Sequence, residues 1–172
     1  MPAQTLISVE DYLHSSYEYD VEYDDGELVE RKMPTGKHSE VMGLLILYLG
    51  QHAKTWNIKV LPDCRVRVSP SRVRIPDISV ISGGGDVPNG PLVVAPLFVI
   101  EILSPDDSLT QLRSKAQEYL AMGVKHVWTV DPVSGECYEH LPRNMVPVED
   151  LLLRVDGSHI VIPMAEILES LR

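Results

Sequence analysis

The sequence predicts an α/β domain in which a mixed central β-sheet is flanked by helices on both faces. Two short apolar runs, Leu97 to Leu103 and His126 to Val130, carry this prediction, because such runs are typical of strands covered on both sides. A helical pattern lies between them, and a strand–helix–strand order of this length forms a βαβ unit. We therefore expect the two strands to be parallel neighbours, or near neighbours, in one sheet.

A long helix and a β-hairpin are expected before this unit. Residues 37–56 contain no proline, and apolar side chains recur there at helical spacing, which predicts a largely buried helix. Residues 58–68 and 73–82 are rich in alternating β-forming residues, and Ser69-Pro70-Ser71 separates them. This arrangement predicts a hairpin.

Shorter elements complete the expected order. Capping-box patterns predict that one helix follows Ser8 and another follows Ser108, and Gly123 ends the second helix. Asp24-Asp25-Gly26 predicts a turn. The remaining expectations are a short helix at 9–15, a strand at 27–31, a loop at 83–96, weak strands at 137–141 and 159–162, and a closing helix that starts with Pro163.

The composition favours a single domain over residues 1–172. Hydrophobic residues make up 44% of the chain and charged residues 23%, which excludes a disordered or fibrous protein. The longest apolar run, residues 41–49, is far shorter than the roughly 20 residues of a membrane helix. The N-terminus lacks a secretory signal, so we expect a cytoplasmic protein with no membrane partner and with Cys64 and Cys137 as free thiols.

The net charge of −10 is distributed unevenly. Residues 1–30 contain nine acidic side chains and no Lys or Arg, which leaves a net charge of −1 for residues 31–172. The segment from Lys54 to Arg74 contains six basic residues and one acid. It could be a solvated strand pair or a surface that faces phosphates. If an acidic segment 1–30 covered the functional site instead, nucleic acid would be a poor substrate.

Two carboxylates stand out from apolar surroundings. Glu101 interrupts the run 97–103, and an ionised carboxylate there is costly unless a cation or hydrogen-bond donors compensate. Asp77 follows Pro76 at the edge of a second strand, which is expected to lie next to the strand of Glu101. Two carboxylates that meet where a sheet opens are suited to Mg²⁺, which uses one or two carboxylates together with waters and substrate phosphate.

A basic side chain is expected near these carboxylates. Residue 103, two positions after Glu101 and on the same side of the strand, is a leucine. The nearest available cation is Lys115, on the helix that packs back against the sheet. Its long side chain could reach the carboxylate pair.

These residues belong to an ordered set of short motifs with which the sequence resembles a known family. The motifs are Gly26-Glu27-Leu28, Met33-Pro34, His38, Pro76-Asp77, Glu101-Ile102-Leu103-Ser104-Pro105, Lys115 with Tyr119, Gly123-Val124 and Trp128-Thr129-Val130-Asp131-Pro132. With them the chain resembles the Uma-two family of small restriction-endonuclease-like proteins, part of the PD-(D/E)XK nuclease superfamily. Each motif alone is weak, but the ordered set is specific and extends over about residues 5–141.

The resemblance implies a restriction-endonuclease-like core and assigns roles to individual residues. Asp77 and Glu101 would be metal ligands, and the backbone carbonyl of Ile102 would be a third ligand. Lys115 would be the superfamily's lysine, relocated from the strand to the helix. Position 103 carries no lysine, as is usual in this family, whereas Gln111 stands where members often have an acid.

Structural explanations stay open for each of these residues. Asp77 could cap the end of a strand, and Glu101 could form a buried ion pair with Lys115. Lys115 alone could be an exposed helix lysine. His38 could donate to an active-site group or simply start a helix. A protein that has lost catalysis would show the same pattern.

Other chemistries are disfavoured by spacing. Gly83-Gly84-Gly85-Asp86 is not followed by the lysine and hydroxyl of a nucleotide-binding loop. The two cysteines and six histidines have no zinc-site spacing. Ser104 lacks the context of a nucleophile elbow and is better interpreted as a turn residue.

We therefore interpret the chain as a metal-dependent endonuclease that hydrolyses phosphodiester bonds in nucleic acid, DNA rather than RNA, with Mg²⁺ or Mn²⁺. The candidate catalytic residues are Asp77, Glu101, Lys115 and His38. We expect the two carboxylates to converge at one edge of the sheet and the basic run to line the approach. The alternatives are a catalytically silent nucleic-acid- or protein-binding module on the same fold, and a hydrolase of small phosphorylated molecules. Cutting of both strands would favour a homodimer.

Overall fold

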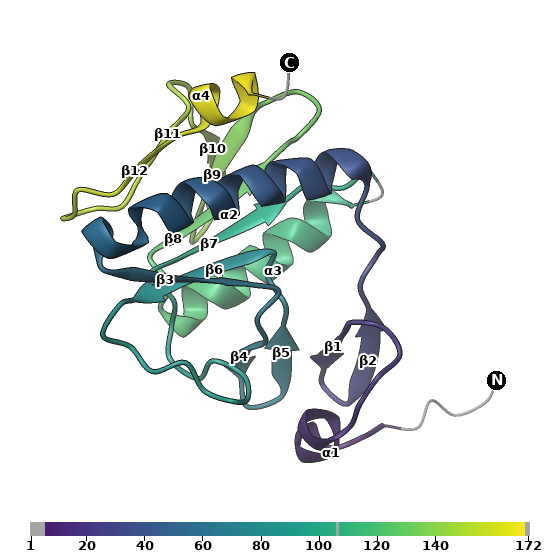
Figure 1. The fold of residues 1–172 in the computed structure, drawn as a ribbon. Helices are drawn as coiled ribbons and strands as arrows, with labels where there is room; N and C mark the ends of the chain where they lie inside the picture. Colours follow the sequence, from purple (N-terminus) through teal and green to yellow (C-terminus); the bar gives the residue numbers. More distant parts are fainter. Residues whose placement is uncertain (1–5, 106, 171–172) are drawn as a thin grey trace.

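This computed structural model describes residues 6–105 and 107–170. These residues form two β-sheets, a two-stranded ribbon and four helices (Figure 1). The larger sheet has the strand order β10-β9-β8-β7-β6-β3, and the smaller one β2-β1-β5-β4. Residues at both ends of the predicted single domain, 1–5 and 171–172, lie outside the described range. The strands are β1 (Val21–Asp24), β2 (Glu27–Glu30), β3 (Ile58–Pro62), β4 (Val66–Ser69), β5 (Arg72–Arg74), β6 (Ile78–Ser82), β7 (Phe98–Ile102), β8 (His126–Val130), β9 (Cys137–Leu141), β10 (Asn144–Pro147), β11 (Leu152–Arg154) and β12 (Val161–Pro163).

The predicted βαβ unit is confirmed at the centre of the larger sheet. Strands β7 and β8 are parallel neighbours along their full length. The helix between them, α3 (Leu109–Met122), begins after the N-cap Ser108 and ends at Gly123, whose φ of 110° lies in the left-handed region that glycine adopts without strain. The other neighbouring strands of this sheet pair antiparallel, so the sheet is mixed, as predicted.

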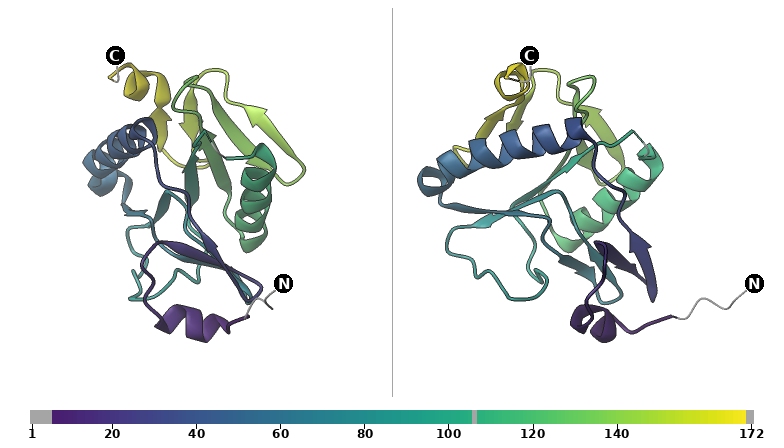
Figure 2. Two further views of the ribbon diagram at one scale, coloured as in Figure 1. Left: turned by 90° about the vertical axis from the view of Figure 1, so that its right-hand side faces the viewer. Right: turned by 45° about the vertical axis from the view of Figure 1, so that its right-hand side comes forward.

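Helices cover both faces of this sheet, as predicted (Figure 2). Helix α2 (Gly36–Trp56) packs on one face through fully buried aliphatic side chains, with α4 (Met164–Glu169) beside it. Helix α3 covers the other face, where Tyr119 packs against Val99. Because side chains alternate along a strand, Glu101 points to the same side as Val99 and faces α3.

The expected hairpin over residues 58–82 is confirmed in its pairing, but each of its arms bends from one sheet into the other. Strands β3 and β6 pair in the larger sheet, whereas β4 and β5 pair in the smaller one. The bends lie at Asp63, which has a φ of 47°, and at Asp77, whose carbonyl accepts a hydrogen bond from Asp63 N at 3.1 Å. Asp77 therefore stands where the two sheets meet, immediately before β6.

Most differences from the expected elements lie near the chain ends. Helix α1 (Val9–His14) follows its predicted cap, Ser8, but β1, β10 and β11 were not predicted. These three strands are only three or four residues long, so they give little periodic signal. Strand β12 begins two residues later than expected, and Pro163 is the N-cap of α4 instead of its first residue.

Cys64 and Cys137 are free thiols, as predicted. Within the described ranges, no helix is both long enough and apolar enough to cross a membrane.

Candidate active site

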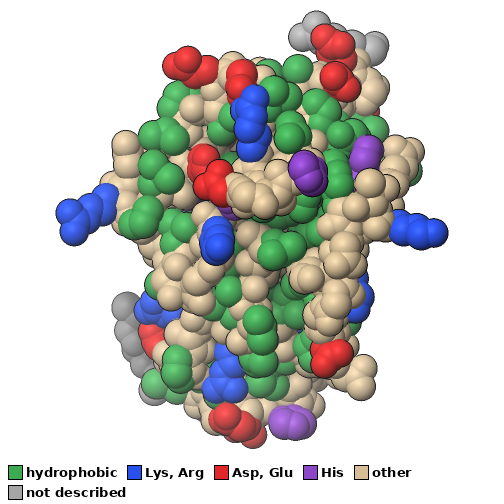
Figure 3. Space-filling model, turned by 90° about the vertical axis from the view of Figure 1, so that its left-hand side faces the viewer, with side chains coloured by type: hydrophobic (Ala, Val, Ile, Leu, Met, Phe, Trp, Pro, Cys, Tyr) green, Lys and Arg blue, Asp and Glu red, His purple; other side chains and the backbone are tan. Residues whose placement is uncertain are grey.

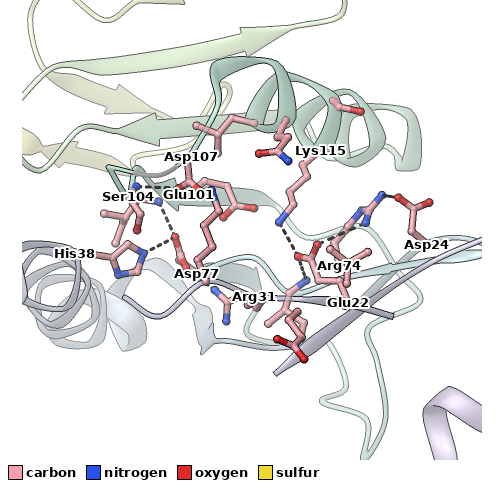
Figure 4. A pocket seen from close by; sticks show the side chains of 18 residues that line it. Glu22, Asp24, Arg31, His38, Arg74, Asp77, Glu101, Ser104, Asp107 and Lys115 are labelled. Carbon is pink, nitrogen blue, oxygen red and sulfur yellow. Dashed lines mark hydrogen bonds and ion pairs between the residues drawn. The ribbon is translucent and has the colours of Figure 1, made fainter. Parts of the chain in front are cut away.

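A polar cavity of about 240 Å³ opens where the two sheets meet helix α3 (Figure 4). Strands β1, β2 and β7, the segment between β5 and β6, the first turn of α2 and the inner side of α3 all contribute to its wall. All the site residues predicted from the sequence line this one cavity. Its charged and polar residues are Glu22, Asp24, Glu30, Arg31, Lys32, His38, Arg74, Asp77, Glu101, Ser104, Asp107, Gln111, Ser114 and Lys115.

Asp77 is held by donors on both carboxylate oxygens. Its Oδ2 accepts a hydrogen bond from the backbone N–H of Ile102 at 2.7 Å and lies 3.1 Å from His38 Nε2. Its Oδ1 accepts from Arg31 Nη2 at 2.7 Å. Because Ile102 directly follows Glu101, the bond to its backbone brings the Asp77 carboxylate next to β7. The two predicted carboxylates therefore converge on one cavity at the edge of the sheet.

Glu101 is buried, as its apolar surroundings predicted, with 8% exposure. Its Oε1 accepts a hydrogen bond from Tyr119 Oη at 2.8 Å. Burial and the negative charge of Asp77 raise the pKa of Glu101 well above its ordinary value, and the opposing effects of Lys115 and Tyr119 are smaller. A positive charge beside the two carboxylates would therefore be strongly favoured.

The backbone at Ile102 offers a third oxygen on the same side of β7. Its N–H points to Asp77, the residue immediately before β6 begins at Ile78. The N–H and C=O of one strand residue point to the same neighbour, so the Ile102 carbonyl lies on the Asp77 side. The next N–H, of Leu103, points the other way and donates to the Val130 carbonyl at 2.8 Å.

Lys115 reaches the cavity from α3 and contacts a carboxylate that the sequence analysis did not single out. Its Nζ donates to Glu22 Oε1 at 2.9 Å. Among the described residues, Lys115 pairs with Glu22 and not with Glu101, so the alternative of a buried Glu101–Lys115 ion pair is not formed. Burial lowers the pKa of Lys115, but the charges of Glu101 and Glu22 outweigh that effect and raise it above its ordinary value. The ammonium therefore stays charged at neutral pH.

His38 both begins a helix and contacts the site. Its backbone N–H donates to the side chain of Thr35, the N-cap of α2, while its ring reaches Asp77. Burial lowers the pKa of His38, and the hydrogen bond and charge of Asp77 outweigh that effect and raise it. Within the described part of the chain, its buried Nδ1 has no hydrogen-bond partner. His38 thus contacts one carboxylate oxygen of Asp77, and Arg31 contacts the other.

Arg31 was not predicted as a site residue, yet it bridges two aspartates. Its Nη1 lies 2.7 Å from Asp63 Oδ1 and its Nη2 lies 2.7 Å from Asp77 Oδ1. Burial lowers the pKa of Arg31, and the two aspartates raise it, so the guanidinium is permanently charged. In this structure Arg31 supplies positive charge to one of the two predicted metal ligands.

The sequence contained only a faint signal for these additional residues. Glu22 lies between Val21 and Tyr23, an apolar–polar alternation typical of a strand, but it stands in a segment with many other acids. Arg31 is the first basic residue after that segment. Neither feature separates a site residue from an ordinary surface charge.

Of the basic run Lys54–Arg74, which was expected to line the approach, only Arg74 belongs to the cavity wall. Arg74 lines the cavity, but the rest of the run is distributed over the end of α2 and over β3, β4 and β5, which belong to different layers. On the face seen in Figure 3, Lys and Arg side chains lie singly and form no continuous patch. Three acids from the segment 1–30, Glu22, Asp24 and Glu30, line the cavity instead.

The donors around the cavity fit a divalent cation. Asp77, Glu101 and the Ile102 carbonyl are hard oxygen donors of the kind that Mg²⁺ and Mn²⁺ bind, with waters and phosphate oxygens completing the shell. In residues 6–105 and 107–170, no group of three or more His, Cys, Asp or Glu side chains is arranged for a metal. The predicted donor set has two carboxylates, the number typical of magnesium sites, whereas structural zinc sites use four side-chain ligands.

Comparison with known proteins places the fold in the restriction-endonuclease-like class. A crystal structure described as that of "a putative nuclease belonging to DUF820" from Anabaena variabilis superimposes with a TM-score of 0.79 at 24% sequence identity, covering 96% of this chain and 99% of that chain. The chain belongs to the Uma2 family, whose model, described as "Putative restriction endonuclease", matches residues 9–158. The search of curated proteins gave no match.

Proposed function

We propose that this protein is a single-domain, metal-dependent endonuclease that hydrolyses phosphodiester bonds in nucleic acid, with DNA favoured over RNA. The observation that carries the proposal is the buried Glu101 carboxylate, which shares one cavity with Asp77 and Lys115. Membership of the Uma2 family supports it. The cavity, at about 240 Å³, lies below the usual size range of small-molecule sites, so a small phosphorylated substrate is less well supported.

Each residue has a defined task in this proposal. Asp77, Glu101 and the Ile102 carbonyl would hold Mg²⁺ or Mn²⁺, which when bound activates water and stabilises charge on a phosphate. His38 keeps the Asp77 carboxylate oriented. Lys115 places a charged donor beside the carboxylates, where it would hold the attacking water or bind a phosphate oxygen as negative charge develops.

The charge of the cavity supports metal dependence. Six carboxylates and four Lys or Arg side chains line it, so without an added cation it repels a polyanion. The acidic N-terminal residues near the site would make nucleic acid a poor substrate only while that charge is uncompensated. A divalent ion on Asp77 and Glu101 would remove the imbalance.

A second candidate function is a catalytically silent nucleic-acid- or protein-binding module. The observation that favours it is the contact between Arg31 and Asp77, because a side-chain cation already compensates one of the two expected ligands. Metal-dependent cleavage separates the two functions.

Plasmid cleavage tests the proposal directly. Purified protein should nick or linearise plasmid DNA in Mg²⁺ or Mn²⁺ and not in excess chelator. Asp77→Ala and Glu101→Ala should abolish cleavage, and Lys115→Ala should slow it by about 10²- to 10³-fold, the loss typical of removing one charge-stabilising donor. Asp86→Ala, in the exposed loop after β6, is the matched control and should cleave normally.

Two outcomes would count against the proposal. Undiminished cleavage by Asp77→Ala would indicate a contaminating nuclease or a different site. Wild-type protein that binds DNA without ever cutting it would favour the silent module. Cleavage of both strands would predict a homodimer, which light scattering can detect.

A further inference from the structure

Glu22 is the most deeply buried carboxylate among the described residues of the cavity wall, with 1% exposure. A buried carboxylate is strongly disfavoured unless several donors compensate it. Its Oε1 accepts hydrogen bonds from Lys115 Nζ at 2.9 Å and from Ile75 N at 3.1 Å. Its Oε2 lies 3.5 Å from Arg74 Nη1. Such complete compensation indicates a carboxylate that the fold holds in one position.

Lys115 depends on such a fixed partner. A lysine side chain is long and flexible, and this one is 30% exposed on the rim of α3, so water competes for its ammonium. Glu22 comes from β1 in the smaller sheet and binds the ammonium from across the cavity (Figure 4). We propose that Glu22 is the positioning residue for Lys115, holding its ammonium where a scissile phosphate would enter beside Glu101. This inference rests on the proposed nuclease function.

The contact between Glu22 and Lys115 can be removed without leaving the neighbouring Arg74 unpaired. Arg74 has other partners, because its guanidinium lies 2.6 Å from Glu118 Oε2 and 2.8 Å from Asp24 Oδ2. Loss of the Glu22 charge therefore leaves Arg74 paired but takes from Lys115 its direct ionic partner.

The substitution Glu22→Gln tests the positioning role with little change in shape. The amide oxygen can still accept from Ile75 N, but the negative charge that pairs with the Lys115 ammonium is gone. We expect kcat for plasmid cleavage to fall by roughly 10- to 100-fold, as for other residues that orient a catalytic group, with KM and Mn²⁺ affinity unchanged. The matched control is Glu118→Gln, which weakens the same Arg74 network outside the cavity and should leave kcat close to the wild-type value.

A double-mutant cycle distinguishes positioning from general structural support. If Glu22 acts through Lys115, the Glu22→Gln/Lys115→Ala protein should be no slower than Lys115→Ala alone. Losses that multiply in the double variant would overturn the proposal. An equal loss of kcat in Glu118→Gln would also overturn it, because the network as a whole would then be responsible.

A measurement without catalysis keeps this inference separate from the nuclease proposal. In ¹⁵N NMR of the metal-free protein, the Lys115 ammonium should be motionally restricted in the wild type and mobile in Glu22→Gln. Equal mobility in both proteins would overturn the positioning role. If the wild type never cleaves DNA, the nuclease proposal fails, and the NMR comparison still decides whether Glu22 positions Lys115.

Discussion

Tyr119 Oη donates a buried hydrogen bond of 2.8 Å to Glu101 Oε1, which joins helix α3 to the central strand β7. Burial, followed by the charge of Glu101, raises the pKa of Tyr119 well above its ordinary value, so the phenol stays protonated and remains a donor. The bond favours the ionised form of Glu101 and opposes the rise in its pKa. Tyr119 is therefore expected to influence both stability and metal affinity.

The substitution Tyr119→Phe should weaken divalent-ion binding as well as the fold. Loss of the donor leaves a buried carboxylate oxygen less satisfied, which typically costs about 1–3 kcal/mol in the free energy of unfolding. Because the ionised form of Glu101 loses support, Mn²⁺ affinity measured by calorimetry should fall by roughly 10- to 100-fold.

Tyr23→Phe provides the matched control for this change. Tyr23 also donates a hydrogen bond to an acceptor at a distance from the cavity, the Ile7 carbonyl at 2.9 Å. The control should lose stability without losing Mn²⁺ affinity. A similar loss of affinity in both variants would mean that the effect of Tyr119→Phe is not specific to Glu101.

The pH dependence of stability should report the buried state of Glu101. Burial and the charge of Asp77 raise the pKa of this carboxyl from 4.5 to about 8. The folded protein then binds the proton more tightly than the unfolded chain does, so this contribution to stability is fully present below about pH 4.5 and is lost as the pH rises through about 8. Urea unfolding of the metal-free protein between these limits measures the decline.

Glu101→Gln isolates that contribution, because an amide does not titrate. The difference in free energy of unfolding between the variant and the wild type should therefore change with pH across this interval. Saturating Mg²⁺ should flatten the wild-type profile, since the ion binds the ionised native state. Parallel profiles for the two proteins without metal would show that Glu101 titrates normally.

The sequence was informative where charge interrupts an apolar pattern. Glu101 was found because it lies within a buried strand, and Asp77 because it stands at the edge of another. Lys115 could be connected to them through the βαβ unit, which fixes which helix packs over which strands. Local patterns of this kind persist in the fold because burial itself produces them.

Residues that depend on the second sheet could not be found in the same way. Glu22 is buried only because β1 pairs with β5, and that contact joins residues about 50 positions apart. The bends at Asp63 and Asp77 divide one apparent hairpin between two sheets, which also distributes the basic run over several layers. Such tertiary relationships leave no periodic signal in a single sequence.

Arg31 should compete with divalent ions for Asp77. Arg31→Met removes the guanidinium that lies 2.7 Å from Asp77 Oδ1 while keeping an unbranched side chain. The metal-free protein should lose about 1–3 kcal/mol in the free energy of unfolding, because Asp77 keeps only its other donors. Mn²⁺ should bind roughly tenfold more tightly, which corresponds to about 1.4 kcal/mol of competition removed.

Arg72→Met is the control for this prediction, since Arg72 lies outside the cavity wall and pairs with Asp24, Asp25 and Glu118 instead of Asp77. It should leave Mn²⁺ affinity unchanged in the same calorimetric titration. Mn²⁺ binding that is unchanged or weaker in Arg31→Met would show that the guanidinium and the ion do not share Asp77. It would also strengthen the silent-module alternative.

DNA binding should itself require a divalent ion, because the cavity is lined by six carboxylates and four Lys or Arg side chains. Fluorescence anisotropy with a labelled duplex can measure this in the slow Lys115→Ala background. Affinity should rise by roughly 10- to 100-fold from chelator to Mg²⁺ at fixed ionic strength, since two phosphate-facing negative charges are compensated.

Adding Asp77→Asn and Glu101→Gln to that background should remove the requirement, because neutral amides replace the two carboxylates that would bind the ion. This triple variant should bind DNA equally well with chelator and with Mg²⁺, although it cannot cleave. Strong binding by the Lys115→Ala protein in chelator would show that the charge of the cavity does not control access. In that case nucleic acid would approach another face of the molecule, and the proposed entry of the scissile phosphate beside Glu101 would have to be abandoned.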